Sequence, residues 1–188
     1  MTITSLDFET ANPSRLSICA TGLAPFEDGR LTETSYSLVR PPKPHGWFHK
    51  VFIKCHRLTH LDVLDTPEFP AIAPELLARL TRADIVIAHN VSFDIGHLRA
   101  TLDHFGLPRP EFSYLCTLQL SRRVWPELQS HRLDTLAAHI AHDFHHHHAQ
   151  ADAEAAGRVL LAMMKHVSAN TPSELLQKVD MTLKRFCR

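Results

Sequence analysis

Acidic side chains at the ends of predicted elements constrain the fold of this chain more than any other feature. Asp7 and Glu9 close the first predicted strand. Asp94 begins a predicted helix, and Asp152 follows His147 by five positions. A domain that brings these carboxylates together needs a cation between them, because like charges repel at short range. Two hard divalent ions would meet that need, and phosphodiester cleavage is the natural chemistry of such a pair.

The composition is that of one globular domain. The chain has 188 residues, of which 44% are hydrophobic, so it can bury a substantial core. No apolar run is long enough to span a membrane, and the amino terminus lacks a signal-peptide pattern. The four cysteines are scattered and form no CxxC pair, which argues against a zinc ribbon. We therefore expect a cytoplasmic protein without membrane association.

The charge balance limits how nucleic acid could be bound. Lys and Arg together number 20, and so do Asp and Glu. A protein that grips long nucleic acid by charge alone has an excess of basic residues. We expect a substrate to be held mainly at the active site, with metal ions supplying much of the positive charge.

Strand patterns come first along the chain, and helix and strand patterns then alternate. The predicted strands are 3–8, 16–23, 31–39, 84–88 and 112–116. The predicted helices are 74–80, 93–105, 117–125, 133–140, 153–164 and 173–186, the last capped by Ser173. Residues 45–70 have no clean period, and we expect a long surface segment there. This order favours a mixed α/β sheet with helices on its faces.

The acidic positions have an ordinary structural interpretation beside the functional one. Asp7 and Glu9 are two apart on a strand, so their side chains point the same way. Alone, such a pair is also typical of a solvated strand end. Asp94 lies just past a buried strand, where α/β sheets place their sites. An acid in the first turn of a helix is also stabilised by the helix dipole.

The third acidic site lies beside a histidine tract. Five helical residues span about 500°, which would leave His147 and Asp152 about 140° apart on one helix. They converge only if His147 belongs to the loop that enters the helix. For His145, His146 and His148 we expect a solvated tract whose side chains point elsewhere.

Taken together, three segments resemble the exonuclease motifs of the DEDDh family, in order and separation. These segments are Asp7-Phe8-Glu9-Thr10, His89-Asn90-Val91-Ser92-Phe93-Asp94 and residues 147–155. The family comprises 3′→5′ exonucleases similar to the proofreading epsilon subunit of bacterial DNA polymerase III. Residues 56–59, 116–123 and 133–136 are also similar to family segments, so the resemblance covers about residues 2–165. Ala11-Asn12 stands where Thr-Gly is common and Arg57 where glycine is usual, which leaves the substrate preference open.

The resemblance implies an RNase H-like fold, with a five-stranded mixed sheet of order 3-2-1-4-5 flanked by helices. It implies an exonuclease domain over residues 1–166. Residues 167–188 would form a helical extension packed on that domain.

The resemblance also implies the reaction and the site. The chain would hydrolyse single-stranded DNA, or RNA, from its 3′ end to 5′-mononucleotides. Asp7, Glu9, Asp94 and Asp152 would hold two Mg²⁺ or Mn²⁺ ions. His147 would take a proton from the attacking water, since a neutral imidazole has a suitable pKa. The residues expected to seat the terminal nucleotide are Thr10, His56, Asn90 and Phe93.

Three alternatives stay open at this stage. The first is an exoribonuclease for short RNA, similar to oligoribonuclease. The second is a proofreading subunit whose tail past His166 docks on a polymerase or another partner in DNA metabolism. The third is a catalytically silent nucleic-acid-binding module, whose signature would be a lost carboxylate or a basic surface. The sequence shows neither sign.

Overall fold

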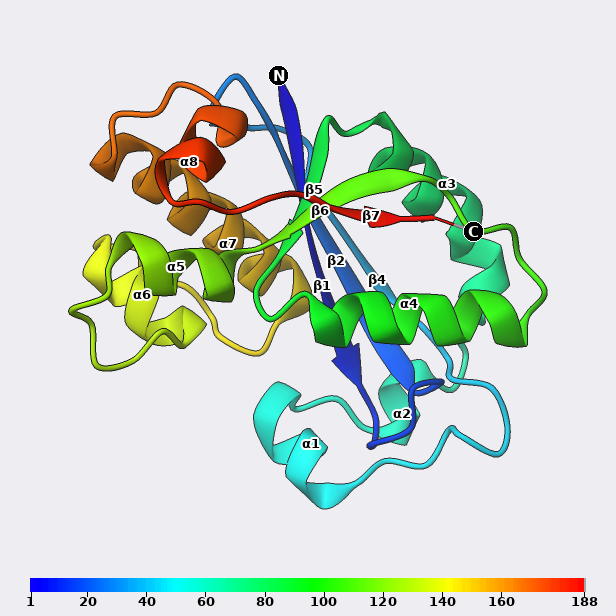
Figure 1. Cartoon of the computed structure of the whole chain (residues 1–188). Helices are drawn as coiled ribbons and strands as arrows, with labels where there is room; N and C mark the ends of the chain where they lie inside the picture. The colour runs from blue at the N-terminus through cyan, green and yellow to red at the C-terminus, as the bar shows by residue number, and fades with distance from the viewer. Residues whose placement is uncertain (188) are drawn as a thin grey trace.

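One mixed sheet runs through the centre of the molecule, with helices against both of its faces (Figure 1). The computed structural model describes residues 1–187. The strands are β1 (Thr2–Thr10), β2 (Ile18–Glu27), β3 (Arg30–Leu31), β4 (Ser35–Leu38), β5 (Ile85–Ala88), β6 (Phe112–Cys116) and β7 (Lys184–Phe186). Their order is β3-β2-β1-β5-β6-β7, and β4 also pairs with β2. β1, β5 and β6 are parallel to one another, and the remaining pairs are antiparallel.

Eight helices surround this sheet in the described part of the chain. They are α1 (Lys50–His56), α2 (His60–Val63), α3 (Phe69–Arg82), α4 (Ser92–His104), α5 (Thr117–Val124), α6 (Leu133–His139), α7 (Ala149–His166) and α8 (Pro172–Lys178). Side chains from α5 to α8 form one apolar core on one face, and α3 and α4 form a second core on the other. Over residues 1–187, no helix has both the length and the apolar character needed to cross a bilayer.

The predicted α/β class and RNase H-like arrangement are confirmed, with two corrections to the strands. The predicted strand over 31–39 is divided into β3 and β4. The strand is interrupted at Thr32, whose N–H and hydroxyl both donate to the carbonyl of Pro25. The sheet also gains β7 beside β6, beyond the five strands expected. The order 3-2-1-4-5 therefore describes the centre of a sheet of seven strands.

The surface segment expected over 45–70 and the bounds of two predicted helices, 74–80 and 173–186, were wrong. The segment 45–70 contains α1 and α2, and α3 begins at Phe69, so Pro74 lies inside it. The predicted helix over 173–186 ends at Lys178 as α8, with Thr171 as its N-cap in place of Ser173. The chain then extends into β7 because the Phe186 ring stacks on Phe112 with a centroid distance of 4.9 Å.

Helix α7 lies unusually close to β2. A β-carbon at Gly22 would overlap the backbone of Ala149 at the start of α7. A β-carbon at Gly157, two turns further along α7, would overlap the ring of Phe26 on β2. Two glycines therefore allow the helix to approach the sheet, and Gly22 is paired with Asp7 in the strand register.

We predict that Gly157→Ala lowers the free energy of unfolding by about 1–3 kcal/mol, because the added methyl group overpacks the contact with Phe26. Gly96→Ala is the matched control, since its β-carbon would meet only the Arg15 guanidinium at 3.5 Å. That change should be neutral or stabilising by up to about 1 kcal/mol. Urea titrations of both variants check this, and equal midpoints would contradict the close approach of α7.

Candidate active site

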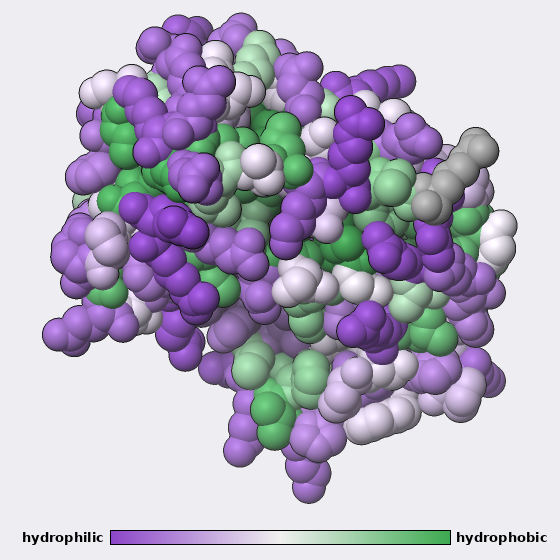
Figure 2. Space-filling model, viewed as in Figure 1, coloured by the Kyte–Doolittle hydropathy of each residue, from purple (hydrophilic) through white to green (hydrophobic). Residues whose placement is uncertain are grey.

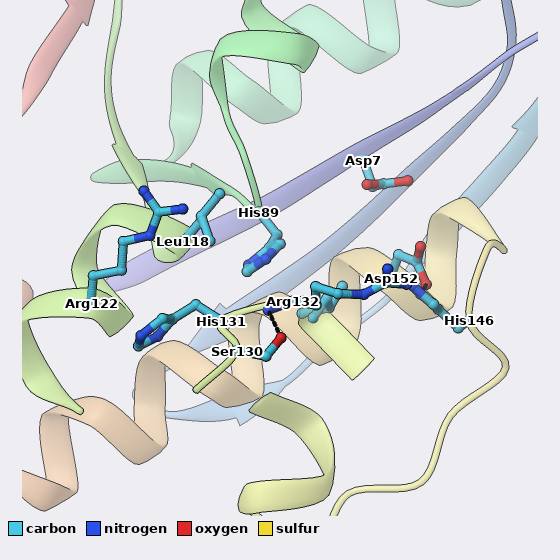
Figure 3. A pocket seen from close by; sticks show the side chains of 10 residues that line it. Asp7, His89, Leu118, Arg122, Ser130, His131, Arg132, His146 and Asp152 are labelled. Atoms are coloured by element: carbon cyan, nitrogen blue, oxygen red, sulfur yellow. Dashed lines mark hydrogen bonds and ion pairs between the residues drawn. The ribbon is translucent and has the colours of Figure 1, made fainter. Parts of the chain in front are cut away.

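Strand β1 delivers two of the carboxylates. Leu6 and Phe8 point into the core beneath α3 and α4, so the alternation of the strand turns Asp7 and Glu9 to the face of α7. Both acids are half-buried. One carboxylate oxygen from each of Asp7, Glu9 and Asp152 lies within 4.8 Å of the other two. Figure 3 shows Asp7 and Asp152 facing each other across the end of the sheet.

Asp152 is fixed by the loop that precedes α7. The backbone N–H of His147 donates to both carboxylate oxygens of Asp152, at 3.1 and 3.2 Å. His147 has a φ of 67°, a left-handed conformation that turns the chain back toward the helix. It therefore lies in the entering loop, where helical geometry requires it to be if it is to reach Asp152.

Asp94 is more deeply buried than the other three carboxylates. Its side chain is 1% exposed, and its Oδ1 accepts the Phe8 N–H at 3.1 Å. β5 pairs with β1 only as far as Ser5, so this N–H has no partner in the parallel strand. Within residues 1–187, the buried Oδ2 of Asp94 has no hydrogen-bond partner. A buried carboxylate oxygen without a partner is costly unless a cation, or water bound to one, compensates for it.

The acidic groups disturb one another strongly. Burial raises the pKa of Asp7 well above its ordinary value, and the charges of Asp94, Asp152 and Glu9 raise it further. Burial likewise raises the pKa of Asp94, although the Phe8 N–H opposes this. The pKa of Glu9 rises to about 8, through burial and the charge of Asp152. Hard oxygen donors that repel one another in this way fit a divalent cation.

Two histidines, and not one, lie beside Asp152. The Nδ1 of His146 is 3.2 Å from Asp152 Oδ1, and the His146 and His147 rings stack at 3.9 Å. The expectation that His146 points elsewhere was therefore wrong, because the left-handed turn at His147 brings adjacent rings to one side. His148 does point away, and stacks on Tyr36 at 4.3 Å.

The two rings differ in their protonation. The hydrogen bond to Asp152 raises the pKa of His146, whereas burial and the neighbouring His146 charge lower the pKa of His147. His147 is therefore the ring that stays neutral to lower pH, and a neutral ring is the form that can accept a proton.

The residues predicted to seat a terminal nucleotide separate into two groups. Thr10 and Phe93 line a pocket of about 230 Å³ next to the carboxylates. Its other lining residues are Asn12, Pro13, Arg15, Phe52, Ser92 and His97. Asn90 and His56 do not line it. The Asn90 side chain accepts from Ser92 at 3.3 Å.

The His56 side chain stabilises the backbone near the site through two hydrogen bonds. Its Nδ1 accepts the Leu58 N–H at 3.0 Å, so its Nε2 carries the proton and donates to the Thr10 carbonyl at 3.1 Å. Both ring nitrogens are thus engaged with backbone, and they attach the end of α1 to the end of β1. This bond fixes the backbone at Thr10, directly after Glu9.

The departures from the family pattern have local explanations. Asn12 is fully buried, and its amide nitrogen donates to the carbonyls of His45 and Trp47 at 2.8 and 2.6 Å. Its amide therefore holds a loop. Arg57 caps α1 with a φ of 66°, the left-handed conformation that favours glycine at this position. The backbone shape is thus kept although the glycine is not.

A larger pocket of about 510 Å³ opens on the other side of the carboxylates. Asp7, His146 and Asp152 line one end, and Arg122 and His131 line the other (Figure 3). Ser130, Arg132 and His89 also line the pocket, and the Arg132 side chain extends toward Asp152 and His146. In the view of Figure 2, the surface is hollowed and hydrophilic between α1 and the α5–α6 side. Sequence reasoning missed this basic end. Its residues come from two separate segments, α5 and the loop before α6. Their positive charge was the only signal in the sequence that could have indicated them.

A carboxylate cluster at the centre of a mixed α/β sheet, with an imidazole beside it, defines a metal-dependent nuclease of the RNase H-like class. The family model described as Exonuclease matches residues 4–160. The chain belongs to this exonuclease family, and its acidic and histidine motifs place it in the DEDDh branch.

Curated relatives are much longer proteins. The chain is 36% identical over 114 residues to the DNA polymerase III PolC-type of Lacticaseibacillus paracasei, covering 59% of this chain and 8% of the relative. It is 28% identical over 165 residues to that of Caldanaerobacter subterraneus, covering 85% of this chain and 11% of the relative. The chain thus spans about a tenth of these proteins.

Solved structures share the fold. Exonuclease X in complex with 5′ overhanging duplex DNA has a TM-score of 0.74 at 23% identity, over 93% of this chain and 98% of that chain. The nuclease domain of 3′hExo, a DEDDh family member bound to rAMP, has a TM-score of 0.75 at 13% identity, over 97% and 96%. At sequence identities this low, the similarity shows a shared fold and nothing more.

We predict that the metal-free protein loses stability as the pH rises from about 4.5 to about 8. Glu9 has an ordinary pKa of 4.5 and a pKa of about 8 in the fold, so the folded state binds the extra proton between these values. That contribution is complete below pH 4.5, declines progressively as the pH rises, and is lost above about pH 8. Glu9→Gln should flatten the dependence. Melting temperatures measured in EDTA test this, and parallel curves for the two proteins would contradict it.

Proposed function

We propose that this protein is a 3′→5′ exonuclease that releases 5′-mononucleotides from single-stranded nucleic acid with two Mg²⁺ or Mn²⁺ ions. The observation that carries the proposal is the convergence of Asp7, Glu9 and Asp152 oxygens within 4.8 Å, beside the unpartnered Asp94 Oδ2. Such a set of hard oxygen donors suits Mg²⁺ and Mn²⁺ better than softer metals.

Each carboxylate has a distinct place in this proposal. The charges of Asp94, Asp152 and Glu9 all act on Asp7, so Asp7 would help to hold both ions. Glu9 and Asp152 would complete the site on the nucleophile side, and Asp94 would act on the second ion, directly or through water. When bound, such ions polarise the scissile phosphate, favour the nucleophilic form of water and stabilise the leaving oxygen.

His147 would take the proton from the attacking water. Its lowered pKa keeps the ring neutral, and the backbone bonds from His147 to Asp152 hold it near the ions. His146 would act as a positioning residue, since its contact with Asp152 Oδ1 orients that carboxylate.

The 3′-terminal nucleotide would enter the pocket that Thr10 and Phe93 line. Phe93 is 37% exposed and offers a ring face to a base. Asn90 and His56 do not line this pocket, but their hydrogen bonds with Ser92 and Thr10, which do, would fix its shape.

The proposed substrate is single-stranded DNA, because the curated relatives are named as DNA polymerases. RNA is the alternative, since a solved relative is titled for recognition of a histone mRNA stem-loop. The polymerase names also favour a partner in DNA synthesis. Residues 1–166 would form the exonuclease domain, with residues 167–188 as its extension.

The direct test is digestion of 5′-labelled and 3′-labelled single strands, DNA and RNA in parallel. We expect 5′-mononucleotides to be released from the 3′ end with Mg²⁺ or Mn²⁺ and no release in EDTA. Asp7→Asn should reduce turnover by orders of magnitude and leave the fold intact, because it relieves repulsion. Cleavage of a closed circle, or activity that persists in EDTA, would refute the proposal.

Alanine substitutions at the four adjacent histidines test the proton acceptor. His147→Ala should reduce turnover by about 10²–10⁴-fold, the usual value of a positioned base. His146→Ala should instead raise the Mn²⁺ concentration needed for half-maximal rate, and His145→Ala is the exposed control. The wild-type rate should fall on the acid side as His147 protonates, below the ordinary imidazole pKa. Equal losses at all four positions would contradict this assignment.

A further inference from the structure

The larger pocket beside the carboxylates changes its charge from one end to the other. The acidic end consists of Asp7 and Asp152, and the basic end consists of Arg122, His131 and Arg132. Figure 3 shows Arg122 on α5 and His131 before α6 across the pocket from the carboxylates, and the Arg132 side chain extending from the same segment toward Asp152 and His146. The chain has no formal net charge, so this basic end is a local feature and not part of a general positive surface.

The arginines of the basic end are available to a ligand. Among residues 1–187, no acidic side chain lies within ion-pair distance of Arg122. Arg132 is 3.3 Å from Asp134, but its side chain is 70% exposed. An exposed ion pair of this kind is weak, so it does not occupy the guanidinium.

The loop that carries this basic end is held in place before any ligand binds. The hydroxyl of Ser121 lies 3.1 Å from His131 Nδ1. The Thr135 hydroxyl donates to the Ser130 hydroxyl at 3.2 Å, and the Arg132 N–H donates to the same oxygen at 3.4 Å. Side chains on a fixed loop lose less entropy on binding, which favours a preformed site.

The direction of the bound nucleic-acid strand decides which nucleotide reaches the basic end of the pocket. If the scissile phosphate lies at the carboxylates and the terminal nucleotide lies in the Thr10–Phe93 pocket, the penultimate nucleotide extends to the opposite side. That side is the larger pocket, where Leu118 and Leu133 offer apolar surface between the charged ends. The next phosphate along the strand then meets the arginines.

Resting on the proposed function, we propose that Arg122 and Arg132, with His131 and Ser130, bind the phosphodiester immediately 5′ of the scissile one. Guanidinium groups bind phosphate oxygens in pairs, and such contacts position a strand without reading its sequence. This subsite fixes the position of the nucleic-acid strand along the pocket, so that the scissile phosphodiester lies at the carboxylates.

The first experiment changes the substrate and needs no variant. A single-stranded oligodeoxynucleotide carries one neutral methylphosphonate, either at the linkage directly 5′ of the scissile bond or four linkages further upstream. The wild-type protein should lose about tenfold in kcat/KM for the first substrate only, as expected for one charged contact. Equal rates on the two substrates would overturn the proposal.

The second experiment changes the protein. Arg122→Ala combined with Arg132→Ala should raise KM for the unmodified strand with little change in kcat, because the contact is remote from the reacting atoms. It should also abolish most of the discrimination against the neutral linkage. The slope of log kcat/KM against log salt should fall by about one in the double variant, because one phosphate is no longer neutralised. Arg123→Ala is the matched control, since Arg123 is exposed on the same helix but does not line the pocket.

A third substrate separates this inference from the nuclease proposal itself. The 4-nitrophenyl ester of thymidine 5′-phosphate has a scissile phosphodiester but no upstream phosphate. The ratio of kcat/KM for the oligonucleotide to that for the ester should fall about tenfold or more in the double variant. An unchanged ratio would overturn the subsite alone. Failure of the wild-type protein to hydrolyse either substrate would overturn the proposed function, and this inference with it.

Discussion

The close approach of α7 to β2 is the constraint on which the site depends. Gly22 pairs with Asp7 across the sheet and leaves room for the backbone of Ala149. Asp152 lies in the first turn of the same helix, so the separation of Asp7 and Asp152 is set by this contact. A side chain at Gly22 would push the helix away from the sheet. The packing of small residues therefore decides whether the carboxylates converge.

That convergence works against the stability of the metal-free fold. Burial and mutual repulsion raise the pKa values of Asp7, Glu9 and Asp94, so the charged forms are disfavoured. Backbone N–H groups compensate in part, from Phe8 to Asp94 and from His147 to Asp152. A bound divalent cation would remove most of the remaining repulsion. The cation would thus serve the chemistry and the fold together, as is usual where like charges are gathered at a functional site.

Much of the fold and of the acidic site followed from the sequence. The strand 112–116 was placed without error, and the strands at 3–8 and 84–88 within two residues at either end. Their apolar runs are bounded by turn residues, and such signals are local. The helix over 173–186 failed because β7 is stabilised by Phe112, which lies far away along the chain. The helices in 45–70 are short, and their position depends on contacts such as that of His56 with Thr10.

The sequence by itself predicted which side chains would carry the chemistry: the Asp-x-Glu pair at a strand end, Asp94 at a helix start, and His147 five positions before Asp152. Spacing along a strand or helix is enough to fix the direction of such residues. Only the tertiary structure decided that His146 also reaches Asp152, because that depends on a left-handed φ at a non-glycine residue. It also decided that Arg122 and Arg132 face the carboxylates, since they lie on separate segments that only the packing of α5, α6 and α7 brings to one pocket.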